Sequence, residues 1–219
     1  ALQVLRFAEV FKPRWIVIEN VVSMRNWNRY AELIAAIESL GYKTHVQVLN
    51  SADFGVPQSR RRMFIICARE RKREAVKALR GKVRTARESI DYNGTDNYSP
   101  LRTKRRATAT IERADRAISN VGPNSPFLIV YYGTDHAGGW QSLDVPLRTI
   151  TTLDRFAFVK PSESGHVMRM LQPEELKAAM GWPKAYKINH GTRRDKVKMI
   201  GNAVCSPVMK HIIIDLIRH

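Results

Sequence analysis

The sequence contains little cysteine and little negative charge, and it has no long apolar run. Its two cysteines, Cys67 and Cys205, are too few for a disulfide scaffold and cannot form a zinc site by themselves. No stretch of about 18 apolar residues is present that would span a membrane. The first residues lack the basic-then-apolar layout of a signal peptide, and the chain starts at Ala1 rather than at a methionine. We therefore predict a cytoplasmic location, no membrane contact, and a sequence taken from the middle of a larger unit.

Positive charge, in contrast, is abundant. The chain has 37 Lys and Arg against 20 Asp and Glu, which gives a formal net charge of +17. Between Arg69 and Arg113 there are 14 basic but only 6 acidic residues. Clustered charge of this kind suits a polyanion such as nucleic acid, although a solvated face that keeps the protein soluble is the simpler alternative. A hydrophobic content of 44% is enough for a packed core and excludes a disordered basic tail.

The hydrophobic pattern predicts an α/β fold. Trp15–Glu19 is a short, continuous apolar run that ends in a carboxylate, which is typical of a buried parallel strand. Tyr30–Leu40 has the spacing of an amphipathic helix. Further strands are expected at 45–49, 63–68, 127–132 and 156–159, and further helices at 174–180 and from 206 onward. No period holds between Arg69 and Val121, so a loop-rich insert is expected there.

Four short strings follow one another along the chain. They are Glu19–Val21 (ENV) after the first predicted strand, residues 50–62 (NSADFGVPQSRRR), Pro146–Thr151 (PLRTIT) and Gly201–Val204 (GNAV). In this order and spacing they resemble the motifs of the DNA cytosine-5 methyltransferase family. The resemblance covers nearly the whole chain, and residues 50–62 are its most specific part.

The resemblance implies a fold, a domain division and a reaction. The fold is a partial Rossmann-like, class I methyltransferase sheet with a small, loop-rich target-recognition domain inserted. Residues 1–70 would belong to the catalytic domain, 71–165 to the recognition domain, and 166–219 to helices that return to the catalytic domain. The reaction would transfer a methyl group from S-adenosylmethionine to carbon 5 of a cytosine flipped out of double-stranded DNA. It would serve restriction–modification or regulation, at the nucleoid if the source is a prokaryote.

The catalytic assignments follow from the chemistry of cytosine. Carbon 6 is a poor electrophile unless ring nitrogen 3 is protonated or hydrogen-bonded, and a carboxyl group with a raised pKa can do this. The resemblance assigns this role to Glu19, a contact with the base to Arg62, and support of the pocket to Arg60. Arginines suit such roles because their forked donors hold phosphates and carbonyl oxygens. The simpler interpretations are a strand-end Glu that caps a helix and three arginines on a solvated loop.

The resemblance and the basic insert also suggest cofactor and DNA contacts. Asn202 and Ala203 would lie beside S-adenosylmethionine. The residues predicted to contact DNA are Gln58, Arg60, Arg62, Arg102, Lys104, Arg105, Arg106, Arg148 and Thr149. The aromatic candidates for base stacking are Tyr131, Tyr132, His136, Trp140 and Trp182, for which core or interface positions are the favoured interpretation. The histidines show no metal-binding spacing, so no metal is expected.

Two parts of the family pattern are missing, namely the Pro-Cys string with the nucleophile and the Gly-rich cofactor loop. Cys67 lies in an apolar strand, where burial blunts a thiol, and Cys205 would lie on the cofactor side. We therefore predict a second polypeptide that supplies both parts, and a chain that is inactive alone; a gene fragment or truncation is the competing explanation. A non-catalytic DNA-binding or specificity subunit is the alternative function. A tRNA cytosine methyltransferase is less favoured because of the large basic insert.

Overall fold

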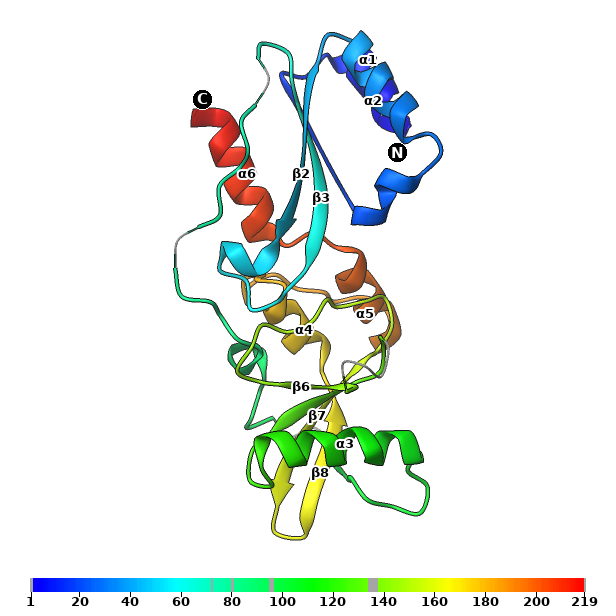
Figure 1. Ribbon diagram of the computed structural model, residues 1–219, viewed down its shortest axis with the longest axis vertical. Coiled ribbons are helices and arrows are strands. Elements are labelled where there is room, and N and C mark those ends of the chain that lie inside the picture. The colour runs from blue at the N-terminus through cyan, green and yellow to red at the C-terminus, as the bar shows by residue number, and fades with distance from the viewer. Residues whose placement is uncertain (1, 72, 80, 95–96, 134–137, 219) are drawn as a thin grey trace.

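The computed structural model describes residues 2–71, 73–79, 81–94, 97–133 and 138–218. Two β-sheets lie at opposite ends of an elongated molecule, with helices between them and on their outer faces (Figure 1). The mixed order of strands and helices confirms the α/β character that the hydrophobic pattern predicts.

The first sheet has three strands in the order β1 (Trp15–Asn20), β3 (Arg61–Ala68) and β2 (Lys43–Asn50). Both pairings are antiparallel, so the prediction of a parallel strand at Trp15–Glu19 was wrong. The apolar run reflects two covered faces and carries no information on strand direction: Ile16 and Ile18 pack in one hydrophobic cluster, Trp15 and Val17 in another.

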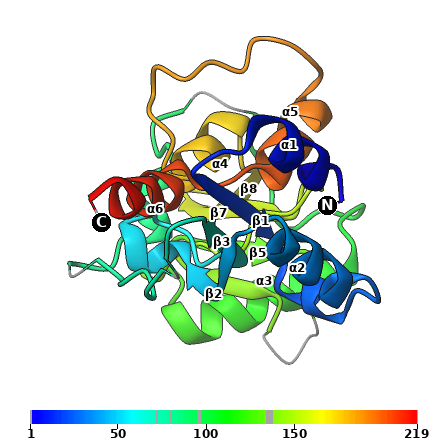
Figure 2. The ribbon, with the colours of Figure 1, turned by 90° about the horizontal axis from the view of Figure 1, so that it is seen from above.

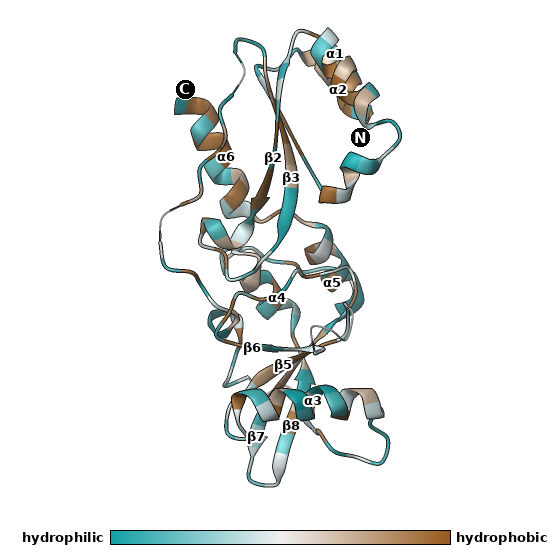
Figure 3. Ribbon diagram, viewed as in Figure 1, coloured by the Kyte–Doolittle hydropathy of each residue, from teal (hydrophilic) through white to brown (hydrophobic). Residues whose placement is uncertain are grey.

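Helices cover both faces of this sheet. Helices α1 (Gln3–Phe11) and α2 (Tyr30–Ser39) pack against each other and against the Ile16 face. Helix α6 (Ser206–Arg218) covers the opposite face, and the view from above shows α2 and α6 on different sides of the sheet (Figure 2). Apolar stretches on α1, α2 and the strands account for this packing (Figure 3).

The second sheet has five strands, all paired antiparallel. Their order is β4 (Ser99–Pro100), β8 (Gly165–Met170), β7 (Phe156–Ser162), β5 (Phe127–Val130) and β6 (Trp140–Ser142). Helix α3 (Thr108–Val121) covers one face of this sheet. This helix lies within the region expected to be loop-rich, and the expectation was wrong there. Ile111, Ala114, Ile118 and Val121 pack in the cluster under this sheet at helical spacing, but they stand among many polar residues in the sequence.

Two further helices, α4 (Pro173–Ala179) and α5 (Arg193–Asn202), lie between the sheets (Figure 1). With α6 they form one hydrophobic cluster that reaches both sheets. Gly201–Val204 was expected to open the last helix, but it contains the end of α5 and the break before α6. The stretch Arg193–Arg218 has the length and composition to cross a membrane, but it consists of these two separate helices. The described residues also include three short 3-10 helices: η1 (Val22–Asn26), η2 (Ser51–Phe54) and η3 (Ala86–Ser89).

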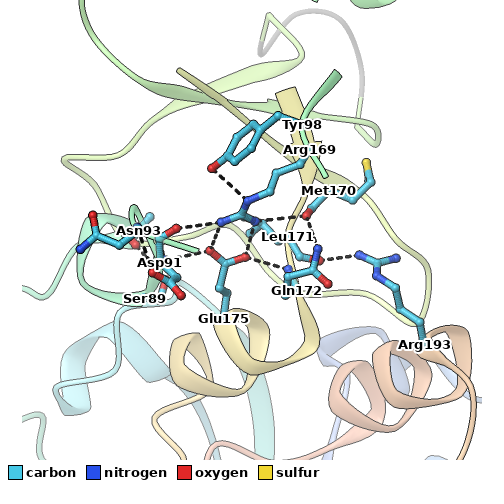
Figure 4. A network of polar contacts seen from close by, with 11 residues as sticks. Ser89, Asp91, Asn93, Tyr98, Arg169, Met170, Leu171, Gln172, Glu175 and Arg193 are labelled. Carbon is cyan, nitrogen blue, oxygen red and sulfur yellow. Dashed lines mark hydrogen bonds and ion pairs between the residues drawn. The ribbon is translucent and has the colours of Figure 1, made fainter. Parts of the chain in front are cut away.

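A buried ion pair fastens α4 to the second sheet (Figure 4). The guanidinium of Arg169 on β8 donates two hydrogen bonds of 2.7 Å to the two carboxylate oxygens of Glu175 on α4. Its remaining donors reach the hydroxyl of Tyr98 and the carbonyl of Asp91. Glu175 also accepts from the backbone N–H groups of Asp91 and Gln172. The charges are therefore paired and surrounded by hydrogen bonds, as buried charges require.

Candidate functional site

A small pocket lies where the sheet meets the loop before α6. Glu19 lies near the end of β1 and Arg62 near the start of β3, and both project from the sheet face that packs toward α6. The Arg62 Nε atom lies 3.3 Å from a carboxylate oxygen of Glu19, and each side chain is 16% exposed. The pocket is lined by Glu19, Leu49, Ser51, Arg60, Arg62, Phe64, Val204, Cys205 and Val208.

The pocket changes the proton affinity of its charged groups. Burial raises the pKa of Glu19, and the positive charges of Arg62 and Arg60 oppose this without cancelling it. Burial likewise lowers the pKa of the Arg62 guanidinium, against the effect of Glu19. A carboxyl group that holds its proton above the usual pH range, next to a guanidinium, can donate one hydrogen bond while its neighbour donates another.

The side chain of Arg60 is buried and connects three segments of the chain. Its side chain is 3% exposed, and its guanidinium donates to the carbonyls of Ile150, Gly201 and Ala203 at 2.8–3.0 Å. Because these bonds occupy both Nη atoms, we describe Arg60 as a buried clamp between the three segments. The prediction that Arg60 contacts DNA does not agree with this burial. Its backbone N–H is held in turn by the side chain of Asn50.

Gln58 and Thr149 belong to the same internal junction. Gln58 is fully buried; its amide donates to the carbonyl of Ala179 and accepts from the backbone N–H of Ile150. The Thr149 hydroxyl donates to the carbonyl of Ser59. The prediction that Gln58 contacts DNA does not agree with its burial, because its polar groups are used inside the protein.

Cys205 was expected on the cofactor side, but it lines the same pocket as Glu19 and Arg62. Burial raises the pKa of the Cys205 thiol, and its Sγ atom lies 3.8 Å from the sulfur of Met180. Burial raises the pKa of the Cys67 thiol to about 12. Neither cysteine is therefore a ready nucleophile, since the thiolate is the reactive form. In the sequence, only its position directly after Gly201–Val204 indicates that Cys205 lies near the functional site.

The chain matches the family of C-5 cytosine-specific DNA methylases over residues 1–218. It belongs to this family. Methylases of this family use S-adenosylmethionine as the methyl donor.

Curated type II methyltransferases are similar to the chain in sequence. M.HhaI of Haemophilus parahaemolyticus is 26% identical over 220 residues, which is 95% of this chain and 64% of that protein. M.MspI of Moraxella sp is 26% identical over 214 residues, 96% of this chain and 47% of that protein. M.AgeI of Thalassovita gelatinovora is 43% identical over 70 residues, 31% of this chain and 16% of that protein. The chain thus spans about half to two thirds of the length of these two relatives, while they match nearly all of it.

Solved structures show the same methyltransferase fold. A mutant of DNMT2 from Spodoptera frugiperda superposes with a TM-score of 0.67 at 15% identity, over 99% of this chain and 70% of that one. A putative DNA modification methyltransferase encoded within a prophage (E. coli) gives a TM-score of 0.62 at 14% identity, over 98% of this chain and 72% of that one.

The basic residues predicted to contact DNA lie at two places on the chain. Lys104 and Arg105 are exposed beside the N-terminus of α3. Arg102 is paired with Asp115 on α3, and Arg106 donates to the carbonyls of Leu101 and Pro100 and to the hydroxyl of Ser99, so these two side chains also make contacts within the protein. Arg148, whose backbone N–H donates to Gln141, is half-buried beside the junction with residues 57–60.

The predicted cofactor residues lie at the end of α5. The Asn202 side chain is exposed and Ala203 is half-buried, and the carbonyl of Ala203 is held by Arg60. Asn202 does not line the pocket of Glu19, whereas Val204 does. Of the aromatic candidates, Trp182 donates to the carbonyl of Val204, Tyr132 donates to the carbonyl of Thr149, and His136 lies outside the described residues.

Proposed function

We propose that this chain forms the base-holding and DNA-recognition part of a DNA (cytosine-5)-methyltransferase. It would hold a cytosine that has been flipped out of double-stranded DNA. The single observation that carries the proposal is the pairing of Glu19 and Arg62 in one pocket, beside the loop that Arg60 clamps. The architecture that follows is a partial Rossmann-like sheet, into which the second sheet is inserted as a target-recognition domain.

Glu19 acts on ring nitrogen 3 of the cytosine. Burial favours the protonated carboxyl, which donates its proton toward nitrogen 3 and so withdraws electrons from carbon 6. The other oxygen of the same carboxyl accepts from the exocyclic amine. These two contacts distinguish cytosine from thymine, because thymine presents a donor at nitrogen 3 and an acceptor at carbon 4.

Arg62 holds the adjacent carbonyl oxygen of the base. Its Nε atom already lies within 3.3 Å of Glu19, so the two side chains present neighbouring donors along one edge of the ring. Arg60 does not touch the base in this mechanism. It fixes the carbonyls of Gly201 and Ala203, and thereby positions the loop that carries Val204 and Cys205 into the pocket.

Asn202 and Ala203 would hold S-adenosylmethionine, which supplies the methyl group when it is bound. The exposed amide of Asn202 suits the methionine end of that molecule, and its place next to the clamped loop keeps it close to the base pocket. These two residues form one wall of a site at most, so the remaining contacts would come from other protein.

A second polypeptide would complete the site and supply the nucleophilic cysteine. β1 is an edge strand whose only described partner is β3, although both its faces are apolar. On the neighbouring α1, the side chains of Phe7, Val10 and Phe11 are 62%, 74% and 71% exposed. An open edge and an apolar surface of this kind favour association. We infer that a strand of the partner pairs with β1 and that the partner covers α1.

The test of catalysis is a complementation assay. The chain is mixed with a polypeptide that carries the Pro-Cys string and the Gly-rich loop, and transfer of labelled methyl groups from S-adenosylmethionine to duplex DNA is measured. Glu19→Gln should reduce turnover by at least about a hundredfold, which is the usual scale of general acid catalysis. The affinity for DNA should stay unchanged. Glu32→Gln, on the exposed face of α2, is the matched control. A well-folded complex that binds DNA but transfers no methyl group would favour the non-catalytic subunit.

Light scattering tests the partner separately. The chain alone should self-associate, and addition of the partner should give one defined complex. Phe7→Glu combined with Phe11→Glu should prevent both, because the two exposed rings lie on the proposed contact surface. A monodisperse monomer formed by the unaltered chain alone would contradict the second polypeptide.

A further inference from the structure

The linker between α5 and α6, residues 203–205, forms one wall of the pocket of Glu19. The side chains of Val204 and Cys205 line this pocket. Both are poorly hydrated groups, and burial is the largest cause of the raised pKa of the Glu19 carboxyl. The position of the linker therefore determines how much water reaches that carboxyl.

Two side chains from distant segments hold the backbone of the linker. Arg60 donates to the carbonyl of Ala203 at 3.0 Å. The next carbonyl, that of Val204, accepts at 3.2 Å from the indole Nε1–H of Trp182, which follows the end of α4. Arg60 and Trp182 are thus the donors to two successive carbonyls of the pocket wall.

The indole of Trp182 is itself held in place. The ring of Tyr186 packs edge-on against it, with 4.9 Å between the ring centroids. A Cβ atom on Gly181 would lie 2.8 Å from the Cγ atom of Pro207, so the residue before Trp182 lies directly on the first turn of α6. The donor therefore comes from a turn that is packed closely on the wall it holds.

We propose that Trp182 is a positioning residue for the pocket of Glu19: its indole N–H holds the carbonyl of Val204 and so keeps the side chains of Val204 and Cys205 against the base. This inference rests on the function proposed for that pocket. Trp182 does not line the pocket, so it acts only through the linker.

Loss of this hydrogen bond should change the acid–base behaviour of Glu19. The charged or titratable groups that act on its carboxyl are Arg60 and Arg62, from the segment that leads into β3, and the thiol of Cys205 from the linker. A linker that moves outward admits water to the carboxyl and leaves both arginines in place. Because burial raises the pKa of Glu19 and the arginines lower it, the pKa should fall.

Thiol labelling of the whole chain tests the position of the linker. Trp182→Phe keeps an aromatic ring against Tyr186 but lacks the N–H donor. Labelling of Cys205 by a maleimide, followed by mass spectrometry, should become about fivefold faster, the factor for loss of one net hydrogen bond. Cys67 is fully buried in β3 and is an internal reference whose rate should not change. Trp140→Phe, at a half-buried tryptophan of the second sheet, should leave both rates unchanged.

The pH dependence of the unfolding free energy tests the effect on the pocket. Compared with Glu19→Gln, it gives the pKa of Glu19 in the folded chain, which should be lower in Trp182→Phe and unchanged in Trp140→Phe. Tyr186→Ala removes the ring that orients the indole. Because Tyr186 is 54% exposed, this variant keeps the test valid if Trp182→Phe does not fold, and it should speed the labelling of Cys205 and lower the pKa in the same way. An unchanged value of either quantity would overturn the proposal.

Failure of the proposed function has a different signature. Both measurements use the chain alone and need no methyl transfer, so they report on the linker even if the complementation assay shows no turnover. Where that assay gives turnover, Trp182→Phe should lower it and leave the affinity for DNA unchanged. The fall of turnover with rising pH should also begin at a lower pH, because Glu19 acts in its protonated form.

Discussion

At the scale of single residues, Arg60 shows how one side chain can join segments that are distant in the sequence. Its guanidinium binds carbonyls at 150, 201 and 203, so it connects the loop before β3 with two of the other short strings of the sequence. The sequence resemblance gives roles to Arg60 and Arg62 but none to Arg61, and in the structure Arg61 is exposed, Arg62 faces the pocket and Arg60 is buried. The alternation of side chains along a strand turns Arg61 away from its neighbours. It does not separate Arg60 from Arg62; Arg60 differs because its guanidinium is held by carbonyls of two distant segments.

Replacement of Arg60 by alanine should therefore lower stability. The variant leaves three carbonyls without their donor in a buried place, and we expect a loss of about 3 kcal/mol in the free energy of unfolding. Urea denaturation measures this loss. Arg61→Ala, at the neighbouring exposed position, should change the same quantity by no more than about 0.5 kcal/mol. Equal effects of the two variants would show that Arg60 does not act as a clamp.

Glu19 should make stability depend on pH. Its pKa is raised in the folded state, so the folded chain holds this proton more strongly than the unfolded chain does. Stability should then fall as pH rises from the unfolded value of about 4.5 through the raised folded value, and it should be constant above that window. The measurement is the unfolding free energy at a series of pH values. Glu19→Gln cannot titrate, so the curve of this variant should lack the fall; an unchanged curve would contradict the raised pKa.

At the scale of elements, Gly201 explains why two of the short strings occur together. A Cβ atom built on Gly201 would overlap the backbone carbonyl of Thr151, so the last turn of α5 lies directly on the PLRTIT segment. Gly201→Ala should lower the unfolding free energy by about 2 kcal/mol because the overlap is with backbone, which cannot rotate away. Lys198→Ala, on the exposed side of the same helix, should stay within about 0.5 kcal/mol. Thermal or urea unfolding of both variants measures these two changes in the free energy of unfolding.

The ion pair between β8 and α4 gives a second prediction at this scale. Glu175→Gln leaves the buried guanidinium of Arg169 without its negative partner, and removal of one member of a buried pair costs about 3–5 kcal/mol. Glu88→Gln breaks the exposed pair with Arg84 and should cost no more than about 1 kcal/mol. Denaturant unfolding compares the two. If both losses were below about 1 kcal/mol, the network of Figure 4 would not hold α4 to the sheet.

The elements also show how far the sequence alone can lead. The strands of the first sheet and helices α2, α4 and α6 are visible as apolar patterns with clear ends, and they occur where expected. Helix α3 was missed although Ile111, Ala114, Ile118 and Val121 have helical spacing, because polar residues outnumber them, and α5 was missed because few of its residues are apolar. The pocket residues Glu19 and Arg62 could be named from their motifs. The burial of Gln58 and Arg60 could not, because it arises from contacts with residues 90–143 positions away.

At the scale of the whole molecule, the positive charge has two different uses. The half-buried Arg106 hydrogen-bonds beside the second sheet and the exposed Arg102 pairs with Asp115 on α3, whereas Lys104 and Arg105 are exposed next to them. A net charge of +17 attracts DNA as a whole. Only the exposed cations, however, can replace counterions on phosphates, so a count of basic residues overstates the number of DNA contacts.

Lys104 and Arg105 should therefore determine part of the salt dependence of DNA binding. Loss of both, as Lys104→Ala with Arg105→Ala, should lower the slope of log affinity against log salt by about 1.8, the value for two phosphate contacts. The slope is measured by fluorescence anisotropy with a labelled duplex. Arg6→Ala with Lys43→Ala removes the same charge from exposed positions on α1 and β2 and should leave the slope unchanged. Arg106→Ala should instead reduce thermal stability, since its guanidinium bonds within the fold. An equal fall in slope for both double variants would mean that net charge, rather than the place of the exposed cations, governs DNA binding.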